Sequence, residues 1–115
     1  MRLTIHGELP GLNEYTKACR TSPIVGWRMK RECEEAIAAQ VASAPHITEP
    51  VTAHFVWYTA DSRRDPDNVA FAKKFVLDAL VAAGVLRGDG RAHVLGFTDA
   101  FYVDRTDPRV EVTLL

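Results

Sequence analysis

Hydrophobic and polar side chains alternate along four stretches of the chain, and this pattern predicts four β-strands. Residues 1–9 carry apolar side chains at odd positions and polar ones at most even positions, as a half-buried strand does. Residues 51–58 are rich in β-branched and aromatic types, which predicts a central strand. Residues 94–103 and 110–114 predict the last two strands, and the turn-forming residues 106–108 between them predict a hairpin.

Apolar residues recur every three to four positions in two other stretches, which predicts two main helices. Ser22–Pro23 are typical of an N-cap followed by the first helical position, and the helix they begin should end near Ala44–Pro45. Residues 10–21, before it, are expected to form a loop. The second helix is predicted from about Pro66 to Ala83, with Gly84 as its stop.

These elements predict a single small α/β domain of the α+β type over residues 1–115. Its order is β-α-β-α-β-β, with a mixed sheet and two main helices. A chain of 115 residues, 47% of them hydrophobic, can build one stable core but not two.

Composition excludes several classes of protein. No apolar run approaches the roughly 20 residues of a membrane-spanning helix, and the N-terminus has the pattern of a strand rather than of a signal peptide. Cys19 and Cys33 are too few for a disulfide framework, and the histidines have no metal-ligand spacing. We therefore expect a cytoplasmic protein with no membrane partner, no zinc and no organic cofactor.

The most informative motif is Arg63–Asn68, with the sequence RRDPDN, which is followed by Gly88-Asp89-Gly90 after the second helix. In extended backbone, side chains two residues apart point the same way, so Asp65 and Asp67 are expected to converge on one point. Carboxylate oxygens are the ligands that hard cations such as Mg²⁺ prefer. The pattern therefore predicts a metal site if the turn at Asp89 returns to this pair.

A lysine is expected to complete the site. Seven positions after Asp67 corresponds to about two helical turns, so Lys74 should face the aspartates, whereas Lys73 should be rotated away by roughly 120°. A structural interpretation stays open for every part of the motif. Asp65 is a good N-cap before a proline, Gly88-Asp89-Gly90 suits a plain turn, and Lys74 with Asp78 suits an i,i+4 surface pair.

A calcium loop is excluded, because Val69 and Ala70 occupy positions where an EF-hand has an oxygen ligand and a glycine. The formal net charge of −1 neither favours nor excludes nucleic acid, since basic residues gather around the motif.

Taken together, these segments resemble the RusA family of Holliday junction resolvases over nearly the whole chain. The similar segments are Arg64–Asn68, Lys74–Leu80, Ala83–Leu86, Asp89 and Asp107–Val112, with a weaker similarity at Gly7–Pro10, Asn13 and Tyr15. The resemblance implies a phage-like or prophage-like homodimer that nicks four-way DNA junctions with Mg²⁺, or with Mn²⁺ in its place.

The resemblance also implies roles for particular residues. The catalytic and metal-binding aspartates fall on Asp65, Asp67 and Asp89. The segment between Asp67 and Asp78 is about three residues longer than in the family, and counting back from Asp78 assigns the catalytic lysine to Lys74. This is the residue that the helical-face argument also selects. The extra length is close to one helical turn, which would move the ammonium away from the metal.

Basic and amide side chains around the motif are expected to contact the DNA backbone. They are Asn13, Lys17, Arg20, Arg63, Arg64, Asn68 and Lys73. Asn68 suits the start of the helix equally well. Two other functions stay open: a metal-dependent nuclease of looser specificity for branched DNA, and a catalytically silent DNA-binding module.

Overall fold

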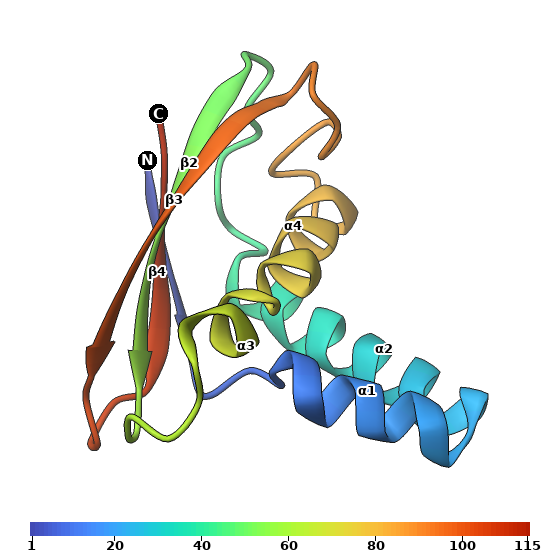
Figure 1. Ribbon diagram of the computed structural model, residues 1–115. Helices are drawn as coiled ribbons and strands as arrows, with labels where there is room; N and C mark the ends of the chain where they lie inside the picture. The colour runs from blue at the N-terminus through green and yellow to red at the C-terminus, as the bar shows by residue number, and fades with distance from the viewer.

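A four-stranded mixed sheet forms one side of the protein, and helices cover one of its faces (Figure 1). The computed structural model describes all 115 residues. The strand order is β1-β4-β2-β3, in which β2 runs parallel to β3 and antiparallel to β4, and β4 runs antiparallel to β1. The predicted mixed α+β fold is confirmed. The strands are β1 (Arg2–His6), β2 (Val51–Thr59), β3 (Val94–Val103) and β4 (Arg109–Leu114).

The last two strands do not form the predicted hairpin. Strand β4 lies between β1 and β2, so the chain crosses the end of β2 after leaving β3. This central position gives β4 a neighbour on both sides, and Val112 becomes fully buried. The turn-forming sequence at 106–108 does form a turn: the Asp104 carboxylate accepts hydrogen bonds from the backbone of Thr106 at 3.1 Å and of Asp107 at 3.2 Å. The predicted turn is therefore confirmed, whereas the predicted pairing of the last two strands is wrong.

Residues 12–21 form helix α1 (Leu12–Thr21) and not the predicted loop. Its N-cap, Gly11, has no side chain that could cap the helix, and the one local capping contact is a long bond of 3.4 Å from the Gly11 N–H to Glu14 Oε1. A residue remote in sequence supplies the cap instead: Asn68 Oδ1 accepts a hydrogen bond from the Asn13 backbone N–H at 2.9 Å. A Cβ at position 11 would lie 2.6 Å from that oxygen, so the close approach requires glycine.

Helix α2 (Pro23–Gln40) begins as predicted, with Ser22 Oγ accepting from the Val25 N–H at 3.2 Å. It ends four residues earlier than the expected boundary at Ala44, in a turn closed by a 3.0 Å bond from Ala44 N to Val41 O. The Gln40 side chain at its end reaches across to strand β1.

The second predicted helix is divided into α3 (Pro66–Ala70) and α4 (Lys73–Ala82). At the break, Ala72 N bonds to Val69 O and Lys74 N bonds to Phe71 O, and both bonds span three residues instead of four. The Phe71 ring lies 5.7 Å from Tyr15 and 5.6 Å from Phe75, between centroids. The break therefore places an aromatic side chain against α1.

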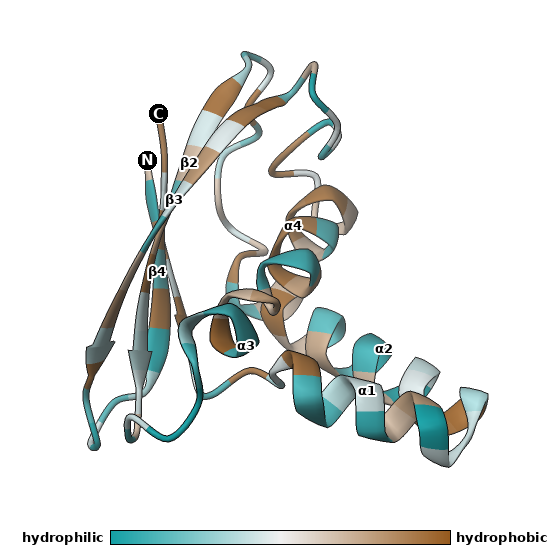
Figure 2. Ribbon diagram, viewed as in Figure 1, coloured by the Kyte–Doolittle hydropathy of each residue, from teal (hydrophilic) through white to brown (hydrophobic).

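The core lies between the sheet and helix α4. Phe55 of the sheet and Phe75 and Leu80 of α4 are almost fully buried. Figure 2 shows α4 as largely hydrophobic along its length, whereas α1 and α2 carry mixed polar and apolar surfaces. Gly84 ends this part of the chain with φ +77°, as a helix stop requires. None of the helices combines the length and the apolar character that crossing a bilayer needs.

Candidate metal and nucleic-acid site

The two aspartates of the RRDPDN motif lie at the start of α3. Asp65 is extended, with φ −65° and ψ 154°, and its side chain makes no capping hydrogen bond. Asp67 is the second residue of the helix, and its Oδ1 accepts from the neighbouring Asn68 N–H at 2.9 Å. The expectation that both lie in extended backbone is therefore wrong, because Pro66 begins the helix. Both residues are exposed, and neither carboxylate is in an ion pair.

Asp89 and Lys74 lie in contact. The turn after α4 brings Asp89 Oδ2 to 3.7 Å from Lys74 Nζ, and the same ammonium lies 3.1 Å from Asp78 Oδ1. The predicted i,i+4 pair of Lys74 and Asp78 is thus confirmed. The hydrogen bond to Asp78 is the largest influence on the pKa of Lys74, and with the charge of Asp89 it raises that pKa. Lys74 therefore stays a cation.

Asp65, Asp67 and Asp89 do not form a ready-made cage for an ion. No three histidine, cysteine or acidic side chains lie together in an arrangement that could hold a metal. One reason is the helix break at Phe71–Ala72. Because Asp67 and Lys74 lie on two separate helices, their spacing of seven positions does not correspond to two turns of one helix and does not place them on a common helical face. Lys74 faces Asp78 and Asp89 instead.

Helix α2 adds two charged residues to this cluster, Lys30 and Glu34, which are not among the predicted site residues. Lys30 Nζ lies 3.5 Å from Asp78 Oδ2 and 3.8 Å from Glu34 Oε1. Burial is the main cause that raises the pKa of Glu34, whose Oε1 has no hydrogen-bond partner. Burial also tends to raise the pKa of Asp78. The hydrogen bond with Lys74 and the nearby positive charges outweigh this effect, so the pKa of Asp78 is lowered. No local pattern indicates that α2 packs on α4.

Lys73 faces the sheet. Its Nζ lies 2.6 Å from Asp99 Oδ2 and 4.6 Å from the centre of the Phe97 ring, and its side chain is only 17% exposed. Trp57 Nε1 donates to the other oxygen of Asp99 at 2.8 Å. A contact between Lys73 and a DNA phosphate would require the ammonium to leave this carboxylate.

The two arginines of the motif differ in exposure. Arg64 is 22% exposed and donates to the Leu9 carbonyl at 3.1 Å, while it lies 3.5 Å from Glu14 and 3.9 Å from Glu8. It joins the β1–α1 connection to the start of α3. Arg63 is 89% exposed, and its only ion pair is a 3.8 Å contact with Asp61. Arg63 is therefore available to an external anion, whereas Arg64 has a structural role.

The remaining predicted contacts with DNA lie on helix α1. A polar groove of about 470 Å³ follows the helix, and neither of its two basic residues, Lys17 and Arg20, is in an ion pair. The groove is lined by Asn13, Thr16, Lys17, Arg20 and Thr21. Asn68, by contrast, is buried and caps α1, so its side-chain oxygen is already in use.

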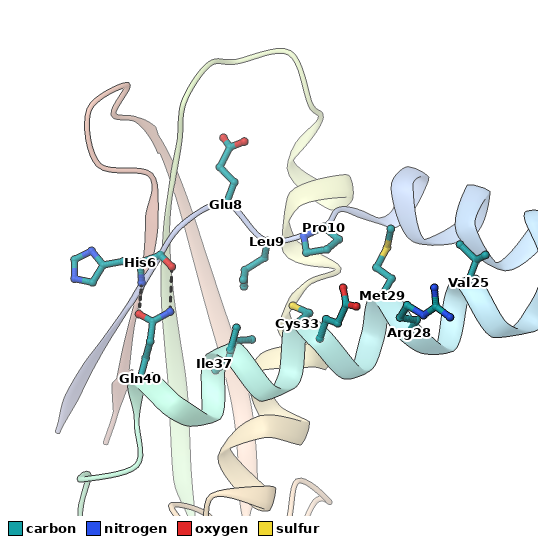
Figure 3. A pocket seen from close by; sticks show the side chains of 12 residues that line it. His6, Glu8, Leu9, Pro10, Val25, Arg28, Met29, Cys33, Ile37 and Gln40 are labelled. Atoms are coloured by element: carbon teal, nitrogen blue, oxygen red, sulfur yellow. Dashed lines mark hydrogen bonds between the residues drawn. The ribbon is translucent and has the colours of Figure 1, made fainter.

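A more apolar groove of about 480 Å³ lies between α2 and the segment that follows β1 (Figure 3). At one end the Gln40 side chain bonds to both backbone groups of His6, at 2.8 Å and 3.1 Å. Within it, burial raises the pKa of the Cys33 thiol to about 11, and the charge of Glu34 adds to this effect. A thiol that stays protonated is a poor nucleophile, so the raised pKa gives no support to a nucleophilic role for Cys33.

Comparison of the chain with protein-family models and with curated proteins found no match.

Proposed function

We propose that this protein is a Mg²⁺-dependent endonuclease that resolves four-way DNA junctions by paired nicks from a homodimer. The observation that carries the proposal is the contact of Lys74 with Asp89, at 3.7 Å. These residues are fifteen positions apart in the sequence, and both belong to the set that the RusA-like motif assigns to catalysis. Their contact supports a common site at the start of α4.

The carboxylates at the start of α3 suit the proposed ion. Asp65 and Asp67 are exposed hard-oxygen donors without cationic partners, two positions apart. Mg²⁺ keeps several waters and is usually bound by one or two carboxylates together with substrate phosphates, so a complete protein cage is not needed. Mn²⁺ accepts the same oxygen donors. When bound, such an ion lowers the pKa of a coordinated water and neutralises charge on the phosphate.

Lys74 and Asp89 would act together beside that pair. The raised pKa of Lys74 keeps its ammonium charged at neutral pH, ready to stabilise negative charge on a phosphate. In the free protein Asp78 and Asp89 hold this ammonium. Substrate phosphate would compete with them for Lys74, and release of Lys74 would free Asp89 to act as a ligand.

Contacts to the DNA backbone are proposed for exposed residues without strong partners. Lys17, Arg20 and Asn13 line one groove on α1, and Arg63 projects from the loop before α3. Phosphate contacts of this kind fix the register of DNA without reading its sequence. The free thiols of Cys19 and Cys33 support a reducing compartment such as the cytoplasm.

The test is incubation with a synthetic four-way junction, with and without Mg²⁺. The proposal predicts paired, symmetric nicks that need the ion, and little cutting of a linear duplex of the same sequence. Equal cutting of flaps, bubbles and junctions would favour the looser nuclease. Binding without cutting at any Mg²⁺ or Mn²⁺ concentration would favour the silent DNA-binding module.

A further inference from the structure

Strand β3 is an open edge of the sheet, with β2 as its only neighbour. It has ten residues and contains no lysine, arginine or proline, the residues that usually protect such edges. Its one charged side chain, Asp99, is neutralised by Lys73. Phe97 is 49% exposed and Val103 52% exposed. A long, apolar and uncharged edge is a template for pairing with another strand.

The opposite edge of the sheet is protected. Strand β1 has only five residues and carries Arg2 and His6 at its ends. The amide of Gln40 bonds to the N–H and the C=O of His6, so these edge groups are occupied by a side chain (Figure 3). The contrast between the two edges indicates that β3, and not β1, accepts a further strand.

The backbone of β3 defines how such a strand would pair. Asp104 N donates to Thr59 O at 2.8 Å, immediately after the strand. In a strand, the backbone N–H and C=O groups of every second residue point toward the same neighbouring strand. The N–H and C=O groups of the even-numbered residues of β3 therefore point toward β2, and those of the odd-numbered residues point toward the open edge. The outward residues beyond the register shift near Gly96 are Phe97, Asp99, Phe101 and Val103.

We infer that a second copy of this chain pairs its β3 with this one, antiparallel, about a twofold axis at Ala100. This register joins Phe97 to Val103 of the partner subunit and Asp99 to Phe101 of the partner subunit, so all four outward residues are paired. An axis at Asp99 would place the two copies of this carboxylate directly opposite each other, which is unfavourable. An axis at Phe101 would leave Phe97 unpaired. The result is one continuous eight-stranded sheet.

The inference rests on and deepens the proposed function, since paired nicks need two equivalent sites. Phe101 and Val103 also line a groove of about 220 Å³ with Pro66 and Val69 of helix α3. The interface therefore borders the helix start that carries Asp65. A twofold axis at Ala100 would bring the two α3 helices, one from each subunit, to the same interface.

The first test is the mass in solution by sedimentation equilibrium. The chain of 12.8 kDa should sediment at twice this mass. Phe101→Glu places a second carboxylate opposite Asp99 of the partner subunit and should increase the dissociation constant at least tenfold. Ile24→Glu is the matched control, because Ile24 is more exposed, at 65% against 38%, and lies on α2. A wild-type monomer, or equal effects of the two variants, would overturn the inference.

The second test is cross-linking in a Cys19→Ser background. Residues at a non-hydrogen-bonded antiparallel position lie about 4.5 Å apart, within disulfide range, so Ala100→Cys should form a covalent dimer on mild oxidation. Thr98→Cys should not, since its copies would lie more than about 13 Å apart along the strands. Cross-linking through position 98 but not 100 would refute the register.

These tests need neither Mg²⁺ nor DNA. A dimer linked through Ala100→Cys that fails to nick a junction would refute the proposed function alone. A dimer that nicks junctions but is not weakened by the change at Phe101 and is not cross-linked at position 100 would refute the interface alone.

Discussion

Lys73 Nζ lies 2.6 Å from Asp99 Oδ2 and joins the first residue of helix α4 to the edge strand β3. The adjacent Lys74 points to Asp78 and Asp89. Two neighbouring lysines thus serve different partners: one holds the helix on the sheet, and the other lies in the candidate site. The two lysines point to different sides of the helix because they are adjacent in sequence, but only the fold determines what each one contacts.

Loss of the Lys73 ammonium should destabilise the fold. Lys73→Met leaves the Asp99 carboxylate, whose side chain is 23% exposed, with only its Trp57 hydrogen bond and should cost about 1 kcal/mol. Asp99→Asn has one acceptor oxygen in place of two, so it can accept from Trp57 or from Lys73 but not from both, and it should cost a similar amount. The free energy of unfolding in urea measures both. If Lys73→Met and wild type have the same free energy of unfolding, the Lys73–Asp99 pair does not stabilise the fold.

The Asn68 side chain should stabilise helix α1 as much as an N-cap does, even though Asn68 lies outside that helix. Asn68→Ala removes the oxygen that accepts from the Asn13 N–H and should cost about 1 kcal/mol of unfolding free energy. Asn68→Asp retains an acceptor and places a negative charge at the helix N-terminus, so it should recover most of this loss. If both variants unfold alike in urea, the side chain has no capping role.

The two cysteines should differ in reactivity. Cys19 is exposed, whereas burial raises the pKa of Cys33 to about 11. A thiol-specific reagent at about pH 8 should therefore modify one thiol rapidly in the folded protein and both in denaturant. Rapid modification of both in the absence of denaturant, and in the Cys19→Ser variant as well, would contradict the burial of Cys33.

Asp78 should make stability depend on acid pH. Its pKa in the folded state is lowered below the ordinary value of about 3.9, so it contributes stability above that value and loses it as pH falls through the folded pKa. Glu34, whose pKa is raised, acts in the opposite direction. The difference in unfolding free energy between wild type and Asp78→Asn should therefore shrink from about pH 6 to about pH 3. A difference that is constant or grows would contradict the assignment.

The sequence predicted the elements whose signals are local. Alternating residues identified the four strands, and Ser22 and Gly84 marked a helix start and a helix stop. It did not predict helix α1, because the cap comes from Asn68, which is remote in sequence. The sequence also did not predict that β4 lies between β1 and β2. Turn residues indicate that the chain reverses direction, but they do not indicate which strand the next strand pairs with.

The candidate site was predictable to a similar extent. The residue types of the motif indicated carboxylate and lysine chemistry, and the structure does bring Lys74 to Asp89. The contributions of Lys30 and Glu34 depend on the packing of α2 against α4, for which no motif exists. The pairing of Lys73 with Asp99 likewise depends on the break at Phe71–Ala72, which no proline or glycine in the sequence marks.

The most direct test of the account is nicking of a four-way junction by wild type and Asp67→Asn at saturating Mg²⁺. Asp67 is exposed and bonds only to its neighbour's backbone, so asparagine should preserve the fold and the binding of the junction measured without Mg²⁺. The account predicts that wild type nicks and that the variant loses at least a hundredfold in rate with unchanged junction affinity. Cleavage by the variant at the wild-type rate would contradict it.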